Sequence, residues 1–89
     1  MKIIWTDNAH HDLQGIKQYL LKQADASIMR SEAERIACAV LRLAQFPSSG
    51  RPGRVPDTRE VVVPPYVIPY RIRGDVVQVL NVFHTSMNL

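Results

Sequence analysis

Residues 66–72 read Tyr66-Val67-Ile68-Pro69-Tyr70-Arg71-Ile72, and apolar side chains occupy every second position. Successive residues of an extended chain point to opposite sides, so Tyr66, Ile68, Tyr70 and Ile72 fall on one face. The alternation predicts a strand with one apolar face. Pro69 has no N–H to donate, so we expect its N side to face away from a partner strand or to lie at a bulge.

Two further strand candidates flank this segment. Arg59–Val63 precedes it across Pro64-Pro65, and Val76–Phe83 follows it after Gly74-Asp75, which favours a tight hairpin turn. Residues 48–54 are predicted to form a loop, because they are rich in Ser, Gly and Pro. The second half of the chain is therefore expected to form an antiparallel sheet.

The first 46 residues contain one glycine and no proline, which indicates helices. A short strand is expected at residues 2–5, and Thr6 or Asp7 then offers an oxygen that caps a helix. Apolar residues recur at helical spacing along this first helix: Ala9, Leu13, Ile16 and Leu20.

A second helix is expected to begin near Asp25 or Ser27 and to end at Phe46, before Pro47. Its apolar positions again share one face: Ala33, Ile36, Val40 and Leu43. Cys38 is expected to be a small buried side chain. The predicted fold is one α+β domain over residues 1–89, in the order β-α-α-β-β-β, with a helical hairpin packed on one face of a small, mainly antiparallel sheet.

The composition, with 46% hydrophobic and 21% charged residues, is that of a globular protein. The single cysteine excludes an internal disulfide and a multi-Cys zinc site, and we expect no metal and no cofactor. No apolar run approaches the roughly 18–20 residues of a membrane span, and the N-terminal apolar stretch is too short for a signal peptide. A cytoplasmic protein with no membrane partner is therefore expected.

The formal net charge is +3, and the basic excess lies in the second half of the chain. Five arginines fall in this half within a short span: Arg51, Arg54, Arg59, Arg71 and Arg73. Guanidinium groups bind phosphate or carboxylate bidentately, so these residues are candidate contacts for RNA, DNA or an acidic peptide. The alternative is a solvated sheet face on which they pair with Glu60, Asp57 and Asp75.

His84 lies at the end of the last predicted strand. It is a candidate general acid or base, because an imidazole titrates near neutral pH. The alternative is a polar residue that ends a strand. His10 and His11 are adjacent on a helix and point about 100° apart, so they are a poor chelating pair.

Several segments of the chain match one known pattern. An Ala-x-x-Asp-Leu-x-x-Ile-x-x-Tyr sequence spans residues 9–19, and a Pro-x-x-Gly-Arg-x-Gly loop spans residues 47–53. Thr58-Arg59-Glu60 precedes Val-x-x-x-Tyr-x-Ile-x-Tyr-Arg over residues 62–71, and the last strand runs into Val82-Phe83-His84. In this order and spacing, the chain resembles the RelE/ParE toxins of type II toxin–antitoxin systems, and specifically the ParE branch.

The resemblance implies a small toxin that causes growth arrest, acts in plasmid stabilisation and is neutralised by a cognate antitoxin in a hetero-oligomer. ParE-like members inhibit DNA gyrase, whereas RelE-like members cleave mRNA, usually on the ribosome. The antitoxin is expected to contact the helical hairpin and the sheet through Leu13, Ile16, Tyr66 and Tyr70. The anionic or target contacts are expected at Arg59, Arg71 and Arg73, with Arg51 and Arg54.

The sequence favours the ParE branch over the RelE branch. RelE-like nucleases place an Arg directly after the first Tyr of the middle strand, where this chain has Val67, and residues 85–89 contain no Arg, Lys or Tyr. RNA cleavage through the 2′-OH needs stabilised charge, a base and an acid, of which Arg71, Arg73 and His84 supply a part. We therefore expect a gyrase inhibitor with no chemistry of its own.

Two alternatives stay open. One is a RelE-like ribosome-dependent endoribonuclease, with His84 as its candidate catalytic residue. The other is an attenuated toxin that retains only antitoxin binding, because many ParE relatives end in His-x-x-Arg followed by an aromatic residue and this chain does not.

Overall fold

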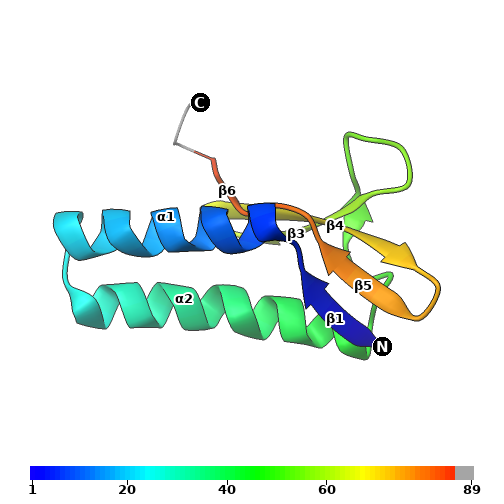
Figure 1. The fold of residues 1–89 in the computed structure, drawn as a ribbon, viewed down its shortest axis with the longest axis horizontal. Helices are drawn as coiled ribbons and strands as arrows, with labels where there is room; N and C mark the ends of the chain where they lie inside the picture. The colour runs from blue at the N-terminus through cyan, green and yellow to red at the C-terminus, as the bar shows by residue number, and fades with distance from the viewer. Residues whose placement is uncertain (86–89) are drawn as a thin grey trace.

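The computed structural model describes residues 1–85, in which two antiparallel helices pack on one face of a six-stranded sheet (Figure 1). The elements, in chain order, are β1 (Lys2–Trp5), α1 (Asp7–Gln23), α2 (Ala26–Leu41), the 3-10 helix η1 (Arg42–Ala44), β2 (Arg51–Pro52), β3 (Arg59–Val63), β4 (Tyr66–Arg73), β5 (Val76–Val79) and β6 (Phe83–His84). The predicted α+β fold and its helical hairpin are confirmed.

The sheet has the strand order β1-β5-β4-β3-β2, and β6 pairs with the start of β4. Every neighbouring pair is antiparallel except β1 and β5, which run parallel. The mainly antiparallel sheet that the sequence predicts is therefore confirmed. The central strand β4 pairs with three others, so its sequence sets the register of most of the sheet.

Both helices begin at side-chain caps. The Thr6 hydroxyl oxygen accepts the Ala9 N–H at 3.2 Å, and an Asp25 carboxylate oxygen accepts the Ile28 N–H at 2.8 Å. Such caps satisfy N–H groups that the first helical turn leaves free. The Thr6 hydroxyl also lies 2.9 Å from the Val79 carbonyl oxygen, to which it donates, so the start of α1 is joined to the end of β5.

The core forms where the apolar stripes of the helices meet the alternating face of β4. Ile16, Ile36 and Val40 pack in one cluster with Tyr66 and Ile68. A second, smaller cluster consists of Leu43, Tyr70 and Val77. Burial of each large apolar side chain contributes about 1.5–3 kcal/mol, so these contacts hold the hairpin on the sheet.

The prediction of one continuous strand over Val76–Phe83 is wrong at its centre. β5 ends at Val79, the Leu80 N–H donates to the Pro69 carbonyl at 2.9 Å, and pairing resumes only at Phe83. Pro69 lies opposite this break, between the part of β4 that pairs with β5 and the part that pairs with β6. A residue without an N–H cannot support a regular ladder there.

The Asp12 carboxylate of α1 binds the polar groups of the crossing residues 80–82. One of its oxygens accepts the Val82 N–H and the Asn81 side-chain amide, each at 3.0 Å. A partly buried N–H that has left the ladder needs such a partner, because an unpaired one costs free energy. Asp12 therefore fixes where the chain crosses from β5 to β6.

Three other sequence expectations need correction. Residues 48–54 include the two-residue strand β2, because Arg51 and Pro52 pair with Glu60 and Arg59. The second helix ends as an α-helix at Leu41, five residues earlier than expected, and continues only as the 3-10 turn η1. Cys38 is exposed and not buried, because it faces away from the core stripe of α2.

Replacing Asp12 by alanine tests the anchor of the crossing segment. The substitution leaves the Val82 N–H without its acceptor, so we expect a loss of about 1–3 kcal/mol in the free energy of unfolding. Urea denaturation of Asp12→Ala measures it, with Glu34→Ala on the exposed side of α2 as the control, expected to shift stability by less than about 0.5 kcal/mol. Equal urea midpoints for Asp12→Ala and the control would refute the anchoring role.

Candidate functional site

The two faces of the sheet carry different residues. Tyr66, Ile68 and Tyr70 of β4 point to the helices and are buried, whereas Arg71 and Arg73 alternate to the opposite, open face. On that face Arg73 lies in a row with Val76 and Lys2, and Arg71 lies in the next row with Gln78 and Ile4. The open face therefore has a basic end, formed by Lys2, Arg71 and Arg73.

The basic end combines exposed and anchored cations. Arg73 is exposed, whereas the Arg71 Nε donates to the Gln78 side-chain oxygen at 2.8 Å, which fixes its direction on the sheet. Ile4, beside them on β1, is 41% exposed. An anion that approaches this end meets cations next to an accessible apolar side chain.

Arg59 stands opposite Tyr70 in the register, on the helix side of the sheet, although it lines one hollow with Arg73. Its guanidinium donates to the carbonyl oxygens of Ser48, at 3.2 Å, and Gly50, at 2.9 Å. Both contacts hold the loop that leads into β2. Arg59 thus stabilises the fold of this loop.

Arg51 is held by an ion pair, whereas Arg54 is exposed in a loop. The Arg51 guanidinium forms an ion pair with Glu60 at 3.0 Å, and Glu60 is only 6% exposed. A buried carboxylate needs such a cation, because burial without one is costly. Arg54 is exposed in the loop that projects beyond β2 and β3 (Figure 1). Of the five arginines, Arg59 and Arg73 therefore line one hollow and Arg71 shares a sheet face with Arg73, whereas Arg51 and Arg54 lie apart from them.

His84 faces the helix side of the sheet. It stands opposite Tyr66 in the register, and the two rings meet edge to face with centroids 5.3 Å apart and an interplanar angle of 84°. Arg71 and Arg73 project from the other face. The structure therefore does not bring His84 together with the two arginines that an RNA-cleaving site would need beside it.

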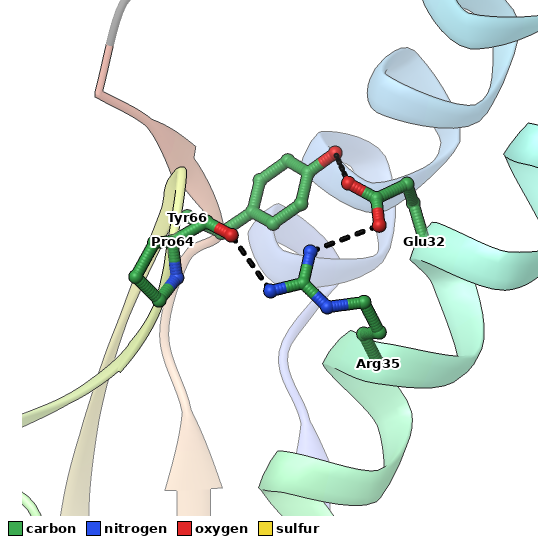
Figure 2. A network of polar contacts seen from close by, with 4 residues as sticks. All are labelled: Glu32, Arg35, Pro64 and Tyr66. Carbon is green, nitrogen blue, oxygen red and sulfur yellow. Dashed lines mark hydrogen bonds and ion pairs between the residues drawn. The ribbon is translucent and has the colours of Figure 1, made fainter.

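Figure 2 shows the polar network that surrounds Tyr66. Its hydroxyl lies 3.4 Å from a Glu32 carboxylate oxygen, and the Arg35 guanidinium forms an ion pair with Glu32 at 2.9 Å. Arg35 also donates to the Pro64 carbonyl at 2.7 Å, so α2 is tied to the turn between β3 and β4. Burial raises the pKa of Tyr66, and the nearby Glu32 charge raises it further.

Sequence reasoning missed Asp12, Glu32 and Arg35 as contact residues. Glu32 and Arg35 have the i, i+3 spacing of an ordinary exposed ion pair, and nothing local indicates that the pair reaches Tyr66 and Pro64. Asp12 has no local partner in the sequence, because its contacts lie about 70 residues away. Only the tertiary fold reveals these roles.

The apolar residues expected to meet the antitoxin are largely internal. Ile16, Tyr66 and Tyr70 are 5%, 1% and 0% exposed, and Leu13 is half-buried against the same core. Tyr70 in addition donates its hydroxyl to the Pro47 carbonyl at 2.7 Å and accepts the Gly50 N–H at 3.0 Å. Within residues 1–85 these side chains serve the core of the fold itself.

The described residues contain neither a cluster of metal ligands nor a helix that could span a membrane. Among residues 1–85, no three His, Cys, Asp or Glu side chains are grouped so that they could hold a metal ion. In the same part of the chain, neither helix has the length and apolar character that a membrane span requires.

Comparison with known proteins identifies the class. Residues 3–89 match the family described as the ParE toxin of the type II toxin–antitoxin system parDE. The chain is 46% identical to a Sinorhizobium fredii protein named "Putative toxin Y4kP", over 93% of this chain and 86% of the relative. It is 32% identical to toxin RelE2 of Caulobacter vibrioides, over 96% of each.

A solved structure has the same fold. The chromosomal ParDE toxin–antitoxin system from P. aeruginosa contains a chain that matches with a TM-score of 0.87, 24% identity and 97% coverage of both chains. The fold and the matched sequences together define a toxin of a type II toxin–antitoxin system, which implies a cognate antitoxin as partner. Within that class, the chain belongs to the ParE toxin family.

The raised pKa of Tyr66 predicts a contribution to stability at alkaline pH. The unfolded chain loses the tyrosine proton near pH 10, before the folded chain does, so the contribution is complete below about pH 10 and is lost as pH rises through the folded pKa. Urea unfolding from pH 8 to pH 11 is expected to show a smaller alkaline loss for Tyr66→Phe than for the wild type. Tyr19→Phe, at an exposed position of α1, is the control; identical slopes for Tyr66→Phe and wild type would contradict the account.

Proposed function

We propose that this chain is a ParE-like toxin that binds DNA gyrase in the cytoplasm, blocks supercoiling without cleaving a substrate itself, and is neutralised by its cognate antitoxin. The observation that carries the proposal is the separation of His84 from Arg71 and Arg73 by the thickness of the sheet. The gyrase target rests on the resemblance to the ParE branch.

The separation argues against a nuclease. Cleavage of RNA through the 2′-OH requires an acid–base group and a cation within hydrogen-bond reach of one phosphate. His84 lies against Tyr66 on the helix side, and Arg71 and Arg73 lie on the open face. One phosphate cannot contact both sides of a sheet at once. An inhibitor that acts by binding alone needs no such convergence.

The open face offers a binding surface in place of a catalytic site. Lys2 and Arg73 are exposed at its basic end, beside the 41% exposed Ile4. Exposed cations around an accessible apolar residue are suited to contact an acidic patch on a protein partner. We assign the gyrase contact to this end of the sheet.

A supercoiling assay tests the proposed activity. Purified chain is expected to inhibit supercoiling of relaxed plasmid by gyrase, and His84→Ala is expected to inhibit within about 2-fold of the wild type, since no step depends on the imidazole. The relative named RelE2 motivates the competing test, in which the chain is added to ribosomes translating a defined mRNA. Cleavage of that mRNA that His84→Ala abolishes would establish the nuclease instead. Inhibition of neither process, with no growth arrest on induction, would leave an attenuated toxin.

Reversing one charge tests the assigned contact surface. Arg73→Glu places a carboxylate where an acidic partner is expected, so the concentration for half-inhibition of supercoiling should rise by about 10-fold or more. Arg30→Glu makes the same charge change on the exposed side of α2 and serves as the control. Equal potency of the two variants would rule out the basic end of the sheet as the contact.

A further inference from the structure

The open face of the sheet carries a row of apolar residues at the end opposite its basic end. Val67 of β4 stands between Val62 of β3 and Phe83 of β6 in the register. All three alternate with residues of the helix side, so their side chains point to the open face. Val62 and Phe83 are 44% and 42% exposed, and Val67 between them is 8% exposed. This apolar row is a surface patch outside both core clusters.

The apolar row and the basic end lie a fixed distance apart. Val67 and Arg73 are six residues apart on the same strand, and at about 3.3 Å per residue they are separated by about 20 Å. Pro69 lies between them, and its register partner Glu60 is neutralised by the Arg51 guanidinium at 3.0 Å. The open face therefore changes from apolar to neutral to basic along β4.

The backbone of β4, which runs along this face, is already paired. Over residues 66–70 it bonds to β3 on one side, and on the other side it bonds to β6 and β5. At the break between β6 and β5, the Pro69 carbonyl accepts the Leu80 N–H at 2.9 Å. A partner that lies over this part of the face contacts side chains only, so it has to satisfy its own backbone hydrogen bonds. A helix does so, whereas a single extended segment does not.

The charges of the basic end select an acidic partner. Within residues 1–85, no carboxylate forms an ion pair with Lys2, Arg71 or Arg73. Asp57 lines a hollow together with Arg73, but the two form no ion pair within the same residues. Carboxylates of a protein partner complement these cations. Nucleic acid phosphates would complement them too, but the same duplex would leave the apolar row, about 20 Å away, against phosphate and water.

We propose that one amphipathic helix of DNA gyrase binds along the open face, with an apolar side chain packed against Phe83 and Val62 and with acidic residues against Arg71 and Arg73. At 1.5 Å per residue, the separation of about 20 Å corresponds to about 13 residues of that helix. The inference rests on the proposed gyrase target. It adds Phe83 as the apolar anchor, because a few aromatic side chains carry much of the binding energy of protein interfaces.

Truncation of the aromatic ring tests the anchor. Phe83→Ala is expected to raise the concentration for half-inhibition of supercoiling by about 10-fold or more, and Phe83→Leu, which keeps an apolar side chain, by less than about 3-fold. Phe46→Ala removes a ring that is 57% exposed beyond η1, away from the sheet face, and should stay within about 2-fold of the wild type. Urea midpoints of the variants separate a loss of contact from a loss of fold.

Photo-cross-linking tests the helix. The probe is p-benzoylphenylalanine, incorporated into the full-length chain in place of Phe83, Val76 or Phe46 and irradiated with purified gyrase holoenzyme. Val76 lies in one row with Arg73 and Lys2, so it reports on the basic end without the removal of a cation. Positions 83 and 76 should cross-link to gyrase residues about 13 positions apart in one segment, and position 46 should give no cross-link.

The outcomes separate this inference from the function on which it rests. Inhibition of gyrase by the wild type with equal potency of Phe83→Ala and Phe46→Ala would overturn the anchor alone. Cross-links about six positions apart would indicate an extended segment, and cross-links to DNA or to a second copy of this chain would indicate another occupant; each would overturn the helix. Absence of any gyrase inhibition by the wild type would overturn the proposed target together with the docking mode.

Discussion

The Thr6 hydroxyl and the Asp12 carboxylate, both near the start of α1, hold the segment in which the chain crosses from β5 to β6. Pro69 cannot donate to a ladder, so the sheet has to break opposite it, and these two side chains bond to polar groups on either side of that break. The break also determines where the end of the chain pairs with the sheet. It returns the chain to the start of β4 as β6 and sets His84 against Tyr66 on the helix side. The same two side chains tie α1 to the end of β5 and to the crossing segment.

This arrangement divides the molecule by function. Residues on the helix side of the sheet are buried in the core. Tyr66 also bonds to the polar network of Glu32 and Arg35, which joins α2 to the turn at Pro64. The open side carries Lys2, Arg71 and Arg73. In this member of the ParE family, His84 lies on the helix side of the sheet, apart from Arg71 and Arg73 on the open side, and the proposed function rests on that separation. The target contact is proposed at the basic end of the sheet, formed by Lys2, Arg71 and Arg73.

Much of the fold could be predicted from the sequence, because helix stripes and strand alternation are local patterns. The stripe from Ala9 to Leu20 and the alternation at Tyr66, Ile68 and Tyr70 lead directly to the observed core. The break at residues 80–82 could not be predicted, because the apolar run from Val76 to Phe83 reads as one strand and its cause, Asp12, is distant. The candidate site was predictable only in part. Arg71 and Arg73 share a face by period two, but the positions of Arg59 and His84 depend on strand register. The short strand β2 could not be predicted either, because it depends on the pairing of Arg51 and Pro52 with Glu60 and Arg59.

The central claim is that this toxin acts by binding to the replication machinery and performs no RNA chemistry. Pulse labelling of DNA and protein synthesis in cells, in the first minutes after induction of the wild-type chain and of His84→Ala, tests that claim most directly. The account predicts that thymidine incorporation falls first, while leucine incorporation continues, and that both proteins behave alike. An immediate fall in leucine incorporation with cleaved mRNA, absent for His84→Ala, would contradict it.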